Sequence, residues 1–169
     1  MRKMNNQRFM RTYTEEEAYL KLTALCATAE HCPQEMADKM QRWGIGEEAQ
    51  QRIIDRLIEG KYIDEERYCR AFVRDKIDYS KWGRRKIEQA LFVKRIPKAI
   101  QQQVLGEVDD ETYVEILRPL LASKRRSIRA DNSYEMNGKL IRFAMQRGFT
   151  MDIIRRCIDD ADEYEPQDD

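Results

Sequence analysis

Three apolar residues, Ile45, Ile96 and Phe149, follow short turns in the sequence and lie 51 and 53 residues apart. The positions nine and five residues before them, and four and nine residues after them, are apolar in all three cases. These positions hold Met36, Ile87 and Leu140; Met40, Leu91 and Ala144; Ala49, Ile100 and Ile153; and Ile54, Leu105 and Ile158. Self-similarity at a spacing of about 50 residues indicates a tandem repeat. The chain is therefore constrained to fold as copies of one small unit.

Within each unit, apolar residues recur at helical spacing, and cap residues mark where helices begin and end. Thr14 and Glu17 form the sequence pattern of a capping box. Pro33 suits the first turn of a helix, and Gly60 suits the end of one. The last unit is predicted to hold helices over about 111–126, 140–146 and 150–160, the first of them containing Pro119. Strand-like alternation is absent from the sequence, which predicts an all-α fold.

Single helices of this length are marginal in water, and a unit of about 50 residues is near the lower limit for independent folding. Neighbouring units must therefore support one another. We predict three tandem three-helix repeats that form an elongated, curved helical array. The predicted segments are a basic flexible arm (1–12), repeat 1 (13–62), repeat 2 (63–108), repeat 3 (109–161) and an acidic tail (162–169).

Charge is unevenly distributed along the 169 residues, although the formal net charge is +0. Residues 67–98 hold eleven Lys or Arg and three acids, and a second group of bases lies between residues 124 and 147. The last eleven residues carry seven acids and no base. One interpretation is an ordinary solvated surface, since single exposed charges contribute little. The concentration of charge favours the other interpretation, a surface for an extended anion such as a nucleic-acid backbone or a carboxylate-rich protein.

Several functional classes lack sequence support. No apolar run approaches the about 18 residues of a membrane span, and no signal peptide is recognisable, so we expect a cytoplasmic protein without a membrane partner. The four cysteines show no CxxC spacing, and we expect reduced thiols. His31 is the only histidine and has no second ligand at metal-site spacing. With no phosphate-binding loop either, the sequence favours a non-enzymatic protein without a cofactor or metal.

Three stretches resemble one known family. They are "GKYIDEERYCRAFVRDKI" (60–77), "GRRKIEQALFVKRI" (83–96) and "KLIRFAMQRGFTMDII" (139–154). All three resemble signature segments of RecX recombination regulators, in the same order along the chain. The resemblance implies three three-helix repeats that lodge in the groove of the DNA-bound RecA filament and suppress ATP hydrolysis and strand exchange. Two departures are Arg95 before the turn, where the family usually has Gly, and the interior Pro119.

From the resemblance and the charge pattern together, we expect a regulator of homologous recombination, acting in DNA repair and the SOS response. Its partners would be the RecA filament and, weakly and without sequence specificity, single- and double-stranded DNA. We expect a monomer. The charge pattern and the repeat register select the contact residues, in two sets. They are Arg70, Arg74, Arg84, Arg85, Lys86, Lys94 and Arg95, and then Lys124, Arg125, Arg142 and Arg147.

A helix-turn-helix DNA-binding transcription regulator is the alternative, because each unit ends in a helix, a turn and a helix. Gln101 and its two neighbours, in "PKAIQQQVL", are residue types that read base edges. Glu47, Glu48 and Asp152, at the corresponding place in the other two units, would approach phosphates with the wrong charge.

Trp82 fits either a lid on the core or a partner contact.

Overall fold

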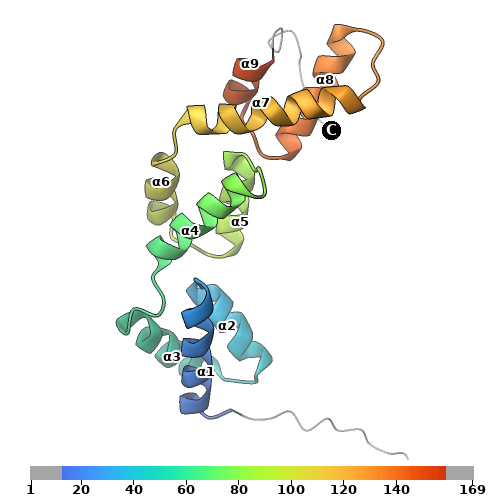
Figure 1. The fold of residues 1–169 in the computed structure, drawn as a ribbon. Helices are drawn as coiled ribbons and strands as arrows, with labels where there is room; N and C mark the ends of the chain where they lie inside the picture. Colours follow the sequence, from blue (N-terminus) through green and yellow to red (C-terminus); the bar gives the residue numbers. More distant parts are fainter. Residues whose placement is uncertain (1–12, 159–169) are drawn as a thin grey trace, which may run out of the picture. The chain divides into compact units, whose positions relative to one another are not determined.

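The computed structural model describes residues 13–158, and all regular secondary structure in that range is helical (Figure 1). The predicted all-α fold is therefore confirmed for this part of the chain. The predicted basic arm and acidic tail lie outside the described residues. The helices of residues 13–158 are α1 (Glu15–Thr28), α2 (Pro33–Arg42), α3 (Glu47–Glu59), α4 (Glu65–Asp78), α5 (Arg84–Val93), α6 (Lys98–Gly106), α7 (Asp110–Ser127), α8 (Ser133–Gln146) and α9 (Met151–Cys157).

These helices follow one another in three groups of three, as the repeat pattern predicts. The repeat bounds stay a prediction; residues 62/63 lie between α3 and α4, and residues 108/109 lie between α6 and α7. By contacts, the chain divides into two compact units, one up to Tyr68 and one from Cys69 onwards. Unit 1 therefore holds repeat 1 with the first turn of α4, and unit 2 holds the rest of repeat 2 together with repeat 3.

The same turn recurs at the predicted register in all three repeats. The backbone amides of Ile45, Ile96 and Phe149 donate to the carbonyl oxygens five residues earlier, over 3.0, 3.2 and 3.1 Å. The residue just before each of them has a positive φ. Those residues are Gly44 (74°), Arg95 (54°) and Gly148 (93°). Repeat 2 therefore holds an arginine in a left-handed conformation that favours glycine.

The core of repeat 1 shows how the apolar pattern folds the unit. Its fully buried side chains come from α1, α2, α3 and the segment after α3. They are Ala18, Leu22, Met36, Met40, Ile53, Leu57 and Ile63. The hydroxyl of Thr14 accepts from the Glu17 amide at 3.1 Å, so this half of the predicted capping box forms. Pro33 occupies the first position of α2, as predicted.

Two predicted helix bounds in repeat 3 are wrong. Helix α8 begins at Ser133 rather than near residue 140, because the Asn132 side chain caps it by accepting from the Glu135 amide at 2.8 Å. Helix α9 ends at Cys157, before residue 160, because Ile158 is already extended. Helix α7 continues through Pro119, whose side chain is exposed. The ring therefore removes one backbone hydrogen bond without ending the helix.

A candidate anion-binding surface on repeats 2 and 3

Repeat 3 is joined to repeat 2 at the start of helix α5, within unit 2. The Gly83 amide donates to the Arg147 carbonyl at 2.8 Å, and the Arg85 amide donates to the Gly148 carbonyl at 3.0 Å. Gly83 is required here by space, because a Cβ atom at this position would lie 2.3 Å from the Phe149 backbone nitrogen. The joint fixes the first turn of α5 against the turn between α8 and α9.

On the repeat 2 side of this joint, two lysines lie over one indole ring. The Nζ atom of Lys76, in α4, is 4.9 Å from the centre of the Trp82 ring, and Nζ of Lys86, in α5, is 4.6 Å from it. A cation at this distance from an aromatic face is attracted by about 0.5–1 kcal/mol when exposed. Lys76 also lies 3.7 Å from the Asp75 carboxylate. Trp82 is half-buried, and its ring is in contact with both lysine cations.

The repeat 3 side of the joint repeats this arrangement with a phenyl ring. Nζ of Lys124, at the end of α7, is 5.1 Å from the centre of the Phe143 ring, and Cζ of Arg147 is 5.2 Å from it. Arg147 also donates to the carbonyl of Ser80 at 3.3 Å, two residues before Trp82. The guanidinium of Arg147 therefore links the Phe143 group to the loop that precedes Trp82.

We name this surface the basic–aromatic strip. Its members are Lys76, Trp82, Lys86, Lys124, Phe143 and Arg147. Four cations and two rings, in two groups linked through one backbone joint, match what single-stranded nucleic acid offers, which is phosphates along a backbone and flat bases beside it. The strip combines the two predicted sets of contact residues, since Lys86 comes from the first set and Lys124 and Arg147 come from the second.

Two predicted contact residues already have acidic partners. Arg70 donates to both carboxylate oxygens of Glu107, over 2.7 and 3.0 Å, and this pairing holds the pKa of Glu107 below its usual value. Arg84 donates to Glu88 at 2.6 Å on the same helix. The positive charge of these two arginines is therefore partly neutralised where they stand.

The other predicted contact residues are spread over unit 2. Arg74, Arg85, Arg125 and Arg142 are exposed, and within residues 13–158 their side chains form no ion pair. Lys94, which is half-buried, and the exposed Arg95 follow the last turn of α5, away from the joint.

Sequence reasoning missed three members of the strip. The charge pattern selects neither Lys76 nor Phe143, and Trp82 fits two interpretations. The available signal was the placement of Trp82 between Lys81 and Gly83, and of Phe143 beside Arg142. Each ring pairs with cations of its own repeat, and the backbone joint at Gly83, which no local pattern reveals, links the two repeats.

The acids, thiols and helices of residues 13–158 bear on metal binding, thiol chemistry and membrane insertion. Among residues 13–158, no three His, Cys, Asp or Glu side chains gather in a way that could hold a metal ion. The four cysteines are free thiols, and burial raises the pKa of Cys26, Cys69 and Cys157. None of the helices in this range has the length and apolar character needed to cross a membrane.

The fold and the strip together define a class, the tandem three-helix-repeat proteins that present a cationic surface. Two family models match the chain in order. The model described as "RecX, second three-helix domain" matches residues 64–105, and "RecX, third three-helix domain" matches residues 111–158. The chain belongs to the RecX family.

Individual relatives agree with this assignment. A protein of Clostridium botulinum named "Regulatory protein RecX" is 30% identical over 136 residues, which cover 79% of this chain and 63% of that protein. A protein of the same name from Bacillus cytotoxicus is 25% identical, over 89% of this chain and 57% of its own length. This chain therefore spans about 60% of the length of these curated relatives.

Solved structures show the same fold. The crystal structure of RecX from Lactobacillus salivarius superimposes with a TM-score of 0.77 at 23% identity, over 89% of this chain and 97% of that one. A second crystal structure, of a regulatory protein RecX, gives a TM-score of 0.79 at 20% identity, over 85% of this chain and 72% of that chain. The predicted helical-repeat fold is thereby confirmed.

Proposed function

We propose that this chain is a non-catalytic, monomeric regulator of homologous recombination in the cytoplasm. It binds in the groove of the DNA-bound RecA filament and lowers both ATP hydrolysis and strand exchange. Membership of a family of regulatory proteins supports the regulatory part of this proposal. The partner and the direction of the effect are the parts that experiments must test.

The basic–aromatic strip is the observation that carries the proposal. A recombinase filament on single-stranded DNA presents a regular, extended phosphate backbone. Lys86 and Arg147 belong to different repeats, and the Gly83–Arg147 hydrogen bond fixes the backbone between them. Cations held in this way pair with successive phosphates, and Trp82 and Phe143 offer flat surfaces for bases.

Regulation then follows from differential binding. A ligand shifts a conformational equilibrium only by the difference between its affinities for the two states. If the strip matches the phosphate spacing of one filament state better than that of another, binding favours that state. The proposed inhibition requires that the favoured state be the one that hydrolyses ATP slowly.

The transcription-regulator alternative is weakened by the side chain of Gln101. Its amide nitrogen donates to the Ile96 carbonyl at 2.8 Å, so Gln101 serves the turn of its own repeat. In repeat 1, Glu47 and Glu48 occupy the first turn of α3, the helix that would have to read a groove. A single binding site preferred far above random DNA would restore this alternative.

The experiment is RecA ATP hydrolysis on single-stranded DNA, with and without this protein. We expect the wild type to lower the rate of hydrolysis. The Lys86→Glu, Lys124→Glu double variant should lose most of this effect, because each reversed charge faces phosphates. Arg42→Glu, an exposed reversal on α2 in repeat 1, is the matched control and should inhibit as the wild type does.

Circular dichroism of each variant verifies that the helical content is intact. Full inhibition by a folded double variant would remove the strip from the proposal. A wild type with no effect on hydrolysis would contradict the proposed function itself.

A further inference from the structure

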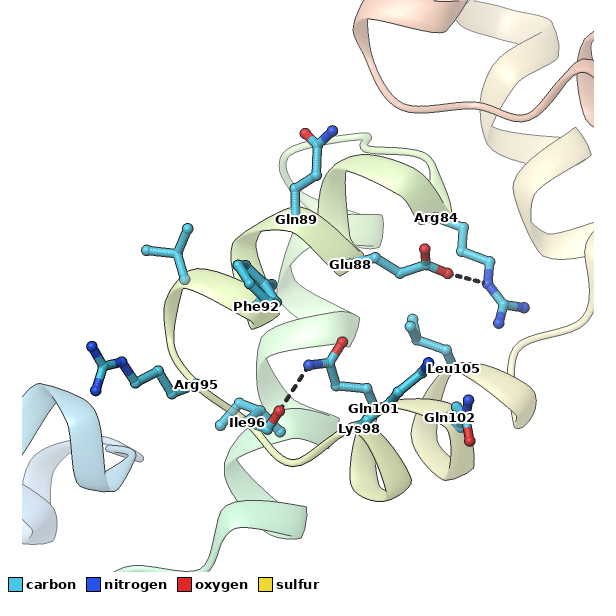
Figure 2. A pocket seen from close by; sticks show the side chains of 11 residues that line it. Arg84, Glu88, Gln89, Phe92, Arg95, Ile96, Lys98, Gln101, Gln102 and Leu105 are labelled. Carbon is cyan, nitrogen blue, oxygen red and sulfur yellow. Dashed lines mark hydrogen bonds and ion pairs between the residues drawn. The ribbon is translucent and has the colours of Figure 1, made fainter.

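A groove with a volume of about 1170 Å³ lies between helices α5 and α6 in repeat 2 (Figure 2). Ile96 and Leu105, both buried, are its apolar base, and Phe92 forms one wall. Figure 2 shows Phe92 from α5 facing the side of α6 that carries Gln101. The groove exceeds the about 300–1,000 Å³ typical of small-molecule sites.

Two large apolar side chains that line this groove are exposed to solvent. Phe92 is 77% exposed and Val93 is 72% exposed, although Leu91 beside them is fully buried. At about 100° per residue, Phe92 lies about 120° around α5 from Lys86, a member of the strip. The groove and the basic–aromatic strip therefore use different faces of the same helix.

Repeat 1 shows that the fold does not need these apolar residues. In the 51-residue register, Gln41 and Arg42 occupy the places of Phe92 and Val93. There the side chain of Gln50, the equivalent of Gln101, donates to the Gln41 side chain at 3.1 Å and bridges the two helices. Repeat 2 has Phe92 in place of that bridging partner. The apolar wall is thus a property of repeat 2 and is not required by the three-helix unit.

The charges around the groove differ between the repeats in the same way. Arg84, Arg95 and Lys98 line it in repeat 2. Their equivalents in repeat 1 are Pro33, Gly44 and Glu47. Glu88, the acid of this groove, pairs with Arg84, which leaves Arg95 and Lys98 to give the groove a positive edge.

We propose that this groove binds an acidic, amphipathic segment of a partner protein. Apolar side chains of the segment would cover Phe92 and Val93, and its carboxylates would pair with Arg95 and Lys98. An amphipathic helix presenting apolar residues at i, i+3, i+4 and i+7 fits an elongated groove of this kind. This surface is separate from the strip, and the inference does not depend on RecA or on DNA.

The test uses the full chain and two synthetic peptides about 16 residues long, with Leu and Phe at those helical positions. One peptide carries glutamates elsewhere, and the other carries lysines at the same places. Binding is measured by fluorescence anisotropy of the labelled peptide. The acidic peptide should bind, and the basic peptide should bind at least about tenfold more weakly because Arg95 and Lys98 repel it.

The decisive variant gives repeat 2 the residues of repeat 1 through Phe92→Gln, Val93→Arg and Lys98→Glu. Since repeat 1 folds with these residues, the variant should fold, and it should weaken acidic-peptide binding by about tenfold or more. Tyr79→Gln is the matched control, because Tyr79 is 83% exposed and does not line the groove. It should leave binding unchanged.

Three results would overturn the proposal. They are equal binding of both peptides, no binding of the acidic peptide, and unchanged binding by the triple variant. A further arm uses the chain without residues 159–169. Acidic-peptide binding that occurs only in this shortened chain would assign the groove to the chain's own acidic segment instead. Since no RecA or DNA is present, failure here leaves the proposed function untouched.

Discussion

The amide of Gly83 and the carbonyl of Arg147 form a 2.8 Å hydrogen bond that joins repeat 2 to repeat 3. Trp82 directly precedes Gly83, and Arg147 contacts both the Phe143 ring and the Ser80 carbonyl, so the two aromatic–cation groups flank this joint. The candidate anion-binding surface therefore depends on a backbone contact as much as on its charged side chains.

Replacing Gly83 tests this joint. In Gly83→Ala the new Cβ atom would meet backbone atoms of Gly148 and Phe149 at 2.3–2.5 Å, and backbone moves less easily than a side chain. We expect the free energy of unfolding to fall by at least about 2 kcal/mol, as for other overpacked sites. Urea unfolding measures it.

Gly106→Ala is the control for this prediction, because a Cβ atom there has nothing within 4 Å. It should be neutral or slightly stabilising. Equal effects of the two substitutions would show that the Gly83 contact is not tight.

A stabilising substitution is predicted at Arg95. Its φ of 54° lies in the left-handed region, where Gly44 and Gly148 stand at the equivalent positions. Arg95→Gly removes this strain at some cost in unfolded-chain entropy, and we expect a gain of about 0.5 kcal/mol. Lys94→Gly, at a φ of −76°, is the matched control and should lower stability by about 0.5–1 kcal/mol. A loss of stability in Arg95→Gly would mean that the Arg95 side chain makes a contact whose stabilising energy exceeds the backbone strain that the substitution relieves.

Stability should depend on pH through the Cys69 thiol. Burial raises its pKa from the ordinary value of 9.0 to about 11, so the unfolded chain releases this proton at lower pH than the folded chain. The stabilisation that this difference in pKa gives the folded chain is complete below pH 9.0, and it is lost as the pH rises to about 11. The difference in unfolding free energy between the wild type and Cys69→Ala should shrink by up to about 2 kcal/mol over this interval.

The measurement is denaturant unfolding of both proteins at several pH values. A difference that stays constant over the interval would mean that the Cys69 thiol ionises equally in the folded and unfolded chains. Thiol labelling provides a second check, because Cys69 is fully buried and should react only after unfolding.

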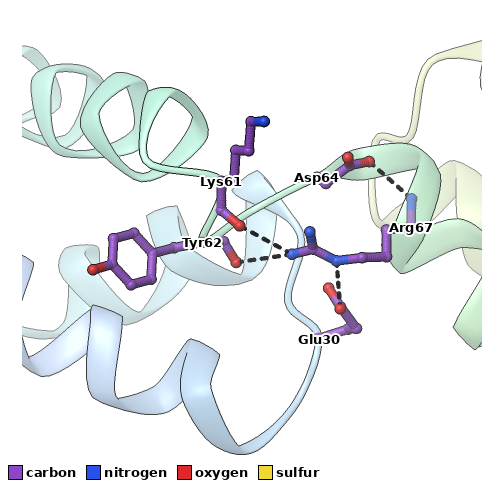
Figure 3. A network of polar contacts seen from close by, with 5 residues as sticks. All are labelled: Glu30, Lys61, Tyr62, Asp64 and Arg67. Atoms are coloured by element: carbon purple, nitrogen blue, oxygen red, sulfur yellow. Dashed lines mark hydrogen bonds and ion pairs between the residues drawn. The ribbon is translucent and has the colours of Figure 1, made fainter.

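Polar contacts near the start of α4, within unit 1, show which interactions sequence reasoning does not reach (Figure 3). Asp64 directly precedes this helix and is a residue type that favours the N-cap, and its carboxylate accepts from the Arg67 amide at 2.9 Å. The Arg67 side chain was counted with the basic surface. Instead it donates to Glu30 at 2.5 Å and to the carbonyls of Lys61 and Tyr62. A helix cap forms between residues that are close in sequence, whereas the Arg67 side chain pairs with an acid 37 residues away.

The fold was predictable because apolar spacing, glycines and prolines act locally. The register of Ile45, Ile96 and Phe149 predicted three equal turns, and the structure has them. The start of α8 is not predicted because residues 133–139, in which Tyr134 and Met136 are the large apolar or aromatic side chains, lack a clear apolar face. A side-chain cap at Asn132 begins the helix there.

The candidate site was only partly predictable. Charge counting identified Lys86, Lys124 and Arg147, which lie in the strip, but it also selected Arg70 and Arg84, which have acidic partners. Net charge along a sequence does not tell which bases have an acidic partner, whether on the same helix, as for Arg84, or on another segment, as for Arg70. Aromatic support for a cation likewise depends on tertiary contacts.

The salt dependence of binding to single-stranded DNA tests the central claim most directly. The logarithm of the binding constant should fall linearly with the logarithm of salt concentration, with a slope of about −0.7 for each phosphate contacted. Replacing Lys86, Lys124 and Arg147 by Gln should reduce the magnitude of this slope by about 2, whereas Arg42→Gln should leave it unchanged. An unchanged slope in the folded triple variant would show that these three cations of the strip do not contact phosphates.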